Sequence, residues 1–128
     1  MYCSKSVDGA PTFLHTSLND AIGHLQRVDL TIPLNRAFVI GGAGLYEDAL
    51  ALPTSGQASV NRVLLTRVLE PAFDDCDVFM PAFEQEGLWQ LAPHAELVQW
   101  VGHDVPEGKQ MENGVEYEFQ MWVKDGGA

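Results

Sequence analysis

A short apolar run that ends in two glycines constrains the fold of this chain more than any other feature. Residues 36–40, RAFVI, have the length and composition of a strand buried on both faces. Gly41 and Gly42 follow at once, and residues 44–52, GLYEDALAL, show the pattern of a helix that Pro53 closes. A strand, a glycine turn and a helix N-terminus in this order can present backbone N–H groups to a phosphate.

The rest of the chain predicts a small number of further elements. Ser17, with Asp20 three residues later, predicts a capped helix over 17–27. Residues 61–69 have the pattern of a second strand, and from Trp89 onward the pattern predicts long strands. These are 89–102 and, after a turn at Asn113-Gly114, 115–124. The order favours an α/β fold of one domain, residues 1–128, with a mixed sheet, two or three helices, a long C-terminal antiparallel hairpin and a frayed tail at 124–128.

Composition excludes some partners. The formal net charge is -11, which argues against nucleic acid as a ligand, because such a surface is basic. No apolar run approaches the roughly 18 residues of a membrane span, and the first residues lack the order of a signal peptide, so a cytoplasmic protein is expected. Cys3 and Cys76 have no metal-ligand spacing, and the run Asp74, Asp75 and Asp77 lacks convergent oxygens. Buried thiols and no metal site are therefore expected.

Four stretches together resemble dihydrofolate reductase. They are FVIGGAGLYEDAL, VNRVLLTRV, DCDVFMP and DVPEGKQMENGVEYEFQMW. The resemblance is to the C-terminal half of the family's enzymes, and among them the sequence resembles those of filamentous fungi most. It implies a truncated reductase-like fold. The family's N-terminal half carries the carboxylate that binds the pterin, and these 128 residues contain no recognisable counterpart of that half.

The resemblance also implies roles for particular residues. The glycine turn and the helix start would bind the cofactor pyrophosphate, Ser4 and Lys5 would take the places that contact the 2′-phosphate of NADPH, and the Gly41-Gly42 peptide would be cis. The residues of the turn and helix start are Gly41, Gly42, Ala43, Gly44 and Leu45. Val78 stands where the family has a threonine in its DTFFP segment. Because valine has no hydroxyl, it cannot make that residue's hydrogen bonds.

These observations favour a repurposed protein that no longer reduces dihydrofolate. The first hypothesis is a cofactor-independent isomerase or cyclase of secondary metabolism that acts on a hydrophobic small molecule. Tyr46 would donate a hydrogen bond to the substrate, and Val39, Ile40 and Val78 would form an apolar wall. The alternatives are an NADPH-dependent reductase of another substrate, a non-catalytic binding module, and a fragment of a longer reductase.

In the resembling family, the first strand lies between the strands that correspond to 36–40 and 61–69. Without that strand, two sheet edges would expose unpaired backbone groups, which is costly. Direct pairing of the two strands, a homodimer, or a separate protein that supplies the missing half would each solve this. The apolar content of 89–101 and 115–123 favours the homodimer.

Overall fold

The computed structural model describes residues 3–5, 11–27, 35–56 and 58–125. The chain forms two compact units, Met1–Ala58 and Ser59–Ala128. The α/β class predicted from the sequence is confirmed, with three α-helices and one four-stranded sheet in the described residues. No helix in this part of the chain is long and apolar enough to cross a membrane.

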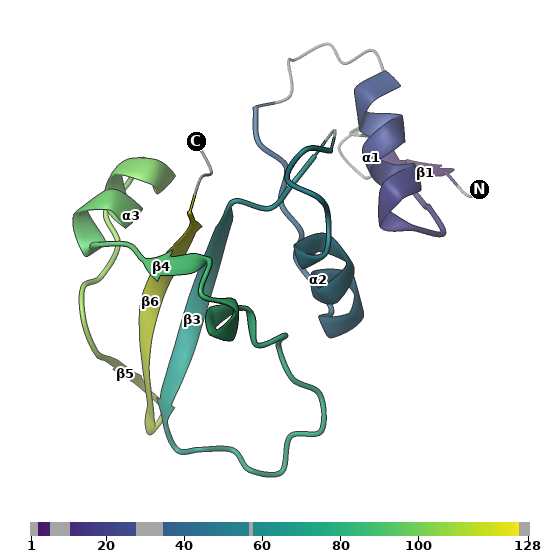
Figure 1. Cartoon of the computed structure of the whole chain (residues 1–128). Helices are drawn as coiled ribbons and strands as arrows, with labels where there is room; N and C mark the ends of the chain where they lie inside the picture. The colour runs from purple at the N-terminus through teal and green to yellow at the C-terminus, as the bar shows by residue number, and fades with distance from the viewer. Residues whose placement is uncertain (1–2, 6–10, 28–34, 57, 126–128) are drawn as a thin grey trace. The chain divides into compact units, whose positions relative to one another are not determined.

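The first unit holds two short strands and two helices (Figure 1). Strands β1 (Cys3–Lys5) and β2 (Pro11–Phe13) pair antiparallel. Helix α1 (Leu18–Arg27) begins where the sequence predicts it, because Ser17 Oγ accepts a hydrogen bond from the Asp20 N–H at 3.1 Å. Helix α2 (Ala43–Leu50) follows the glycine turn, also as predicted.

The predicted buried strand at 36–40 is wrong. Residues 35–42 have no regular secondary structure, and the side chains of Phe38 and Ile40 are 60% and 89% exposed. A strand exists only through its ladder partners. No described strand pairs with this segment, so its apolar sequence alone does not make it a strand.

The second unit is built on one antiparallel sheet. Strand β3 (Arg62–Glu70) pairs with the long strand β6 (Val115–Lys124), and β6 pairs on its other side with two short strands, β4 (Trp89–Leu91) and β5 (Gln110–Glu112). The β5–β6 turn at Asn113-Gly114 is confirmed, with φ of 50° and 77°. The C-terminal hairpin is therefore present, but one of its arms is only three residues long.

The strand predicted over residues 92–101 is wrong, because these residues contain helix α3 (His94–Val101). Pro93 takes the N-cap position, and Gly102 ends the helix in the left-handed conformation with φ of 81°. Leu97 is the buried residue of this helix. The frayed tail was predicted over 124–128, but Lys124 ends β6 and the Asp125 N–H donates a hydrogen bond to the Leu88 carbonyl at 2.7 Å. Residues 126–128 of that prediction lie outside the described residues.

The core of the second unit is aromatic and lies between the sheet and the short helix η1 (Phe83–Glu86). Phe83 is 2% exposed, and its ring makes edge contacts with Trp89 and Trp122 at centroid distances of 5.4 and 5.8 Å. Met121, on the opposite face of β6 from Trp122, is 1% exposed. Both faces of β6 are therefore packed at its C-terminal half.

Candidate functional site

The glycine turn has the backbone geometry of a ligand-binding loop. The Gly41-Gly42 peptide is cis, as the resemblance implied, and Gly41 has φ of 119°, which a residue with a side chain adopts only under strain. Gly42 is the N-cap of α2, with an extended backbone (φ -92°, ψ -155°) and no side-chain cap.

The space in front of this helix N-terminus is open. Apart from its chain neighbours and the backbone of the helix itself, a Cβ added at Gly42 or Gly44 would meet no atom of the described residues within 4 Å. The first backbone hydrogen bond of α2 runs from the Tyr46 N–H to the Gly42 carbonyl at 2.9 Å. The N–H groups that precede Tyr46 in this turn have no acceptor inside the helix, and the positive end of the helix dipole lies there. The site can therefore accept an anionic group close to the backbone.

Tyr46 lies next to the glycine turn. Its hydroxyl oxygen would be 3.7 Å from a Cβ on Gly41, so the phenol covers one side of the turn. Of the predicted apolar wall, Val39 is half-buried and Ile40 is largely exposed in the same unit. Val78 belongs to the second unit and is 69% exposed, and its place beside Tyr46 stays a prediction.

Ser4 and Lys5 form part of β1, where their backbones pair with Thr12 and Pro11 of β2. Their predicted contact with the 2′-phosphate of a nucleotide stays a prediction.

A cavity of about 350 Å³ lies in the second unit, against the sheet and α3. Its lining is mainly apolar, with His103, Asp104 and Thr66 as the polar side chains of interest. The lining residues are Leu64, Leu65, Thr66, Leu97, Val101, His103, Asp104, Val105, Pro106, Phe119 and Gln120. Its volume is within the range of small-molecule sites, about 300–1,000 Å³. The sequence pattern does not indicate this cavity, because it predicts a strand where α3 forms.

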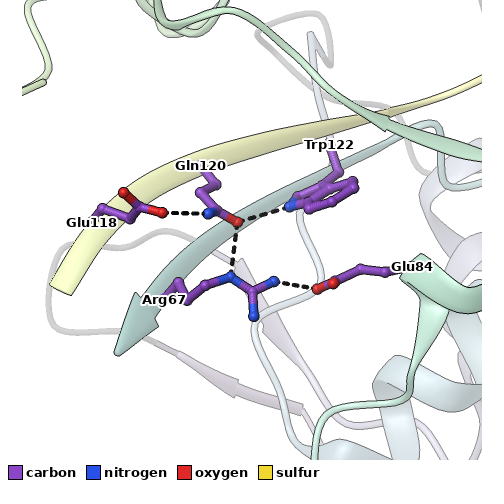
Figure 2. Close-up of polar contacts among 5 residues, drawn as sticks. All are labelled: Arg67, Glu84, Glu118, Gln120 and Trp122. Atoms are coloured by element: carbon purple, nitrogen blue, oxygen red, sulfur yellow. Dashed lines mark hydrogen bonds and ion pairs between the residues drawn. The ribbon is translucent and has the colours of Figure 1, made fainter. Parts of the chain in front are cut away.

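The second unit also carries a polar network that the sequence does not predict (Figure 2). Gln120 is its centre: its Oε1 accepts hydrogen bonds from Arg67 Nε at 3.1 Å and Trp122 Nε1 at 3.0 Å. Its Nε2 donates to Glu118 Oε1 at 2.7 Å, and Arg67 forms an ion pair with Glu84 of η1. Both amide atoms of Gln120 are used in these contacts, and the network joins η1 to the sheet.

Two histidines of the first unit form a pair, and both side chains are partly buried. His24 Nδ1 and His15 Nε2 lie 2.9 Å apart, and the His24 ring packs on Phe13 at a centroid distance of 4.3 Å. The two histidines are nine positions apart in the sequence. They meet because α1 packs beside the segment that precedes it. Among the described residues, no three His, Cys, Asp or Glu side chains form a group that could hold a metal ion.

The prediction of buried thiols is wrong for Cys76, which is exposed and free. The segment around it, residues 71–80, is exposed throughout.

The fold and the glycine turn define a small α/β protein with an open, phosphate-compatible helix N-terminus, and known proteins similar to it are reductases. The chain is 33% identical over 129 residues to the dihydrofolate reductase of Pneumocystis carinii, an alignment that covers 98% of this chain and 55% of that protein. It is 30% identical over 131 residues to the enzyme of the same name from Cryptococcus neoformans, covering 86% of this chain and 56% of that protein. The enzyme of Gallus gallus is 25% identical over 124 residues, which covers 94% and 58%.

The chain spans about half the length of the curated relatives it matches. No family model matches it. The similarity extends over nearly all of the 128 residues, so it includes both the glycine turn of the first unit and the sheet of the second.

This similarity overturns the first expectation about cofactors. A protein without any cofactor was expected, but the relatives are dihydrofolate reductases, an NADPH-dependent family. The expectation was wrong because it rested on the family's N-terminal half, which has no recognisable counterpart in these residues. The glycine turn is present and points to a cofactor.

Proposed function

We propose that this chain binds NADPH through its glycine turn and takes part in reductase chemistry. The observation that carries the proposal is the open space at Gly42, the N-cap of α2, and at Gly44 in the first turn of that helix. A phosphate there would meet backbone N–H groups and the helix dipole without any side chain in the way. NADPH, when bound, supplies a hydride.

The residues of the chain then have distinct parts in binding. Gly42, Ala43, Gly44 and Leu45 offer backbone donors to the pyrophosphate, and Gly41 lets the chain turn towards it. We assign to the Tyr46 hydroxyl, which lies next to Gly41, a hydrogen bond to the nicotinamide end or to a substrate carbonyl. Ser4 and Lys5 are assigned to the 2′-phosphate, with Lys5 as one of seven basic residues in a chain of net charge -11.

The substrate is proposed to be a hydrophobic small molecule. The mainly apolar cavity of the second unit favours this choice, with the Thr66 hydroxyl and His103 as polar groups in its lining. We further propose that the polypeptide of 128 residues, by itself, does not reduce dihydrofolate. It matches only about half the length of its dihydrofolate reductase relatives, and it has valine at position 78.

Two measurements on the purified chain test these statements. Calorimetric titration with NADPH should give saturable binding, and an assay with NADPH and dihydrofolate should show no oxidation of NADPH above background. Val78→Thr alone should not create that activity. Absence of NADPH binding would refute the first proposal, and turnover of dihydrofolate would refute the second.

An isomerase or cyclase reaction, the role first expected from the sequence, makes a different prediction in the same assay. Such a reaction leaves NADPH unconsumed when a hydrophobic substrate is converted, whereas a reductase oxidises one NADPH per product. Product formation without NADPH oxidation would therefore favour the isomerase role for the same cavity.

Self-association is also part of the proposal. The apolar content of 89–101 and 115–123 supports the homodimer expected from the sequence.

A further inference from the structure

Contacts between His15, His24 and Phe13 hold three segments of the first unit together. His15 lies in the segment between β2 and α1, His24 lies on α1, and the Nε2 atom of His15 is 2.9 Å from the Nδ1 atom of His24. The His24 ring also packs on Phe13 of β2 at a centroid distance of 4.3 Å. All of these contacts lie within Met1–Ala58, so they do not depend on where the second unit lies.

The contact between the two rings limits how many protons the pair can carry. A hydrogen bond between ring nitrogens needs one nitrogen that carries a hydrogen and one that is bare. Two neutral imidazoles meet this requirement, and so does a pair that shares one additional proton. Two imidazolium rings do not, because every ring nitrogen is then a donor and two N–H groups face each other. The closed pair therefore holds at most one additional proton, whereas two separated rings hold two.

The other ring nitrogen of His15 makes even one additional proton unfavourable. His15 Nδ1 is buried and has no hydrogen-bond partner among the described residues. If His15 carries the charge, both of its nitrogens bear hydrogens. If His24 carries the charge, its Nδ1 donates to His15 Nε2, and the hydrogen of the neutral His15 ring then lies on Nδ1. Each case leaves a buried N–H without an acceptor, which is costly. Only the neutral pair, with His15 Nε2 donating to His24 Nδ1, leaves His15 Nδ1 bare.

Charged residues on the neighbouring elements do not bond to the two rings. Strand β1 pairs with β2, and α2 contacts α1. The charged residues of β1, α1 and α2 are Lys5, Asp20, Arg27, Glu47 and Asp48. Asp20 Oδ2 accepts a hydrogen bond from the Thr16 hydroxyl at 3.2 Å, and the Arg27 guanidinium would be 3.1 Å from a Cβ on Gly23. In the described part of the first unit, no acidic side chain accepts a hydrogen bond from either ring.

We propose that the His15–His24 pair is a pH-sensitive latch that holds α1 beside β2. Imidazole side chains gain charge between about pH 8 and pH 5. The opened state takes up more protons than the closed pair, so acid favours the opened state, and the latch is fully present only where both rings are neutral. The contact lies outside the glycine turn, and the inference does not depend on NADPH binding.

Amide hydrogen exchange of the full chain without nucleotide, at about pH 7.5 and about pH 5.5, tests the proposal on either side of the imidazole range. Exchange rates are corrected for the intrinsic effect of pH, and β6 of the second unit is the reference within the same sample. The protection of α1 should fall at least about fivefold at the lower pH, because the opened state then binds about one proton more than the closed pair. Carboxyl groups ordinarily titrate below this range. Protection of α1 that changes no more than that of β6 would overturn the proposal.

His15→Gln separates the switch from a merely structural contact. A glutamine amide has both a donor and an acceptor near the place of the imidazole Nε2, so it can bond to His24 Nδ1 whether that nitrogen is bare or protonated. We expect α1 of this variant to be about as protected at the higher pH as in the unmodified chain, and to lose less than about twofold at the lower pH. His24→Phe keeps a ring against Phe13 but cannot titrate, so its α1 should be less protected and equally so at both pH values.

His103→Gln in the second unit is the matched control. His103 is exposed, and its Nδ1 contacts the Asp104 carbonyl, so α1 should keep its full response to pH in this variant. A response of α1 that survives in His15→Gln or His24→Phe would overturn the proposal, and so would loss of the response in His103→Gln.

Discussion

The Tyr46 hydroxyl lies against the backbone of Gly41, where a Cβ would be 3.7 Å from the Tyr46 oxygen. The two residues are joined by the turn that begins α2, and Gly41 has φ of 119°. One side of the turn is therefore closed by a phenol, and the other side, at Gly42 and Gly44, is open.

Gly41 and Gly42 should respond differently to the same substitution. Gly41→Ala forces a side chain into a positive φ, which costs about 1–3 kcal/mol, so the thermal unfolding of the first unit should move to lower temperature. Gly42→Ala has an allowed φ of -92° and open space around the Cβ, so stability should change by less than about 1 kcal/mol. Circular dichroism melts of the two variants make the comparison, and equal destabilisation would contradict it.

Tyr46→Phe should leave folding unchanged and weaken NADPH binding by about 2- to 10-fold, the effect of one hydrogen bond of about 0.5–1.5 kcal/mol. The control is Tyr117→Phe in the second unit, whose hydroxyl contacts Glu112 at 3.4 Å. That variant should bind NADPH like the unmodified chain. Equal NADPH affinities for the unmodified chain and both variants would show that the Tyr46 hydroxyl does not contribute to NADPH binding.

Arg67→Met should lower the free energy of unfolding of the second unit by about 0.5–1.5 kcal/mol, because it removes the bond to Gln120 and the ion pair with Glu84. Glu84→Gln should cost less, since both partners of the ion pair are more than one third exposed. All three tryptophans lie in this unit, so urea unfolding followed by tryptophan fluorescence reports on it. A larger loss from Glu84→Gln than from Arg67→Met would show that the Gln120 bond is unimportant.

Phe83→Ala should be the most destabilising of these changes, at about 3–5 kcal/mol, because it empties the space between Trp89 and Trp122. Phe79→Ala is its matched control: the same side chain is removed from a position that is 72% exposed, and the change should be below about 0.5 kcal/mol. Urea midpoints of the two variants check this difference, which would vanish if the aromatic cluster were not the core.

Elements with a local signal were predictable from the sequence. The cap at Ser17, the glycines before α2, the strand pattern of residues 61–69 and the turn at Asn113-Gly114 each specify their structure within a few residues. The candidate nucleotide site was predictable for the same reason, because a glycine turn before a helix is a local arrangement.

Elements that depend on partners were not predictable. The apolar run at 36–40 has the composition of a strand but no described neighbour to pair with. Residues 94–101 are equally apolar and form a helix, because Pro93 starts it, Gly102 ends it, and Leu97 and Val101 are spaced by one helical turn. The cavity beside α3 is lined by segments that are distant in the sequence, so no local pattern could indicate it. The His15–His24 pair joins residues only nine positions apart, but it depends on how α1 packs against the segment before it.

Binding of NADPH at the glycine turn is tested most directly by calorimetric titration of the unmodified chain against Gly42→Ala. The variant should fold normally, since its new methyl group meets no atom within 4 Å, but that methyl group occupies the space assigned to the pyrophosphate. We expect saturable binding of one NADPH per chain, weakened at least about tenfold in the variant, a difference of about 1.4 kcal/mol. Undetectable binding by the unmodified chain, or equal affinity in a folded Gly42→Ala protein, would show that the glycine turn is not a nucleotide site.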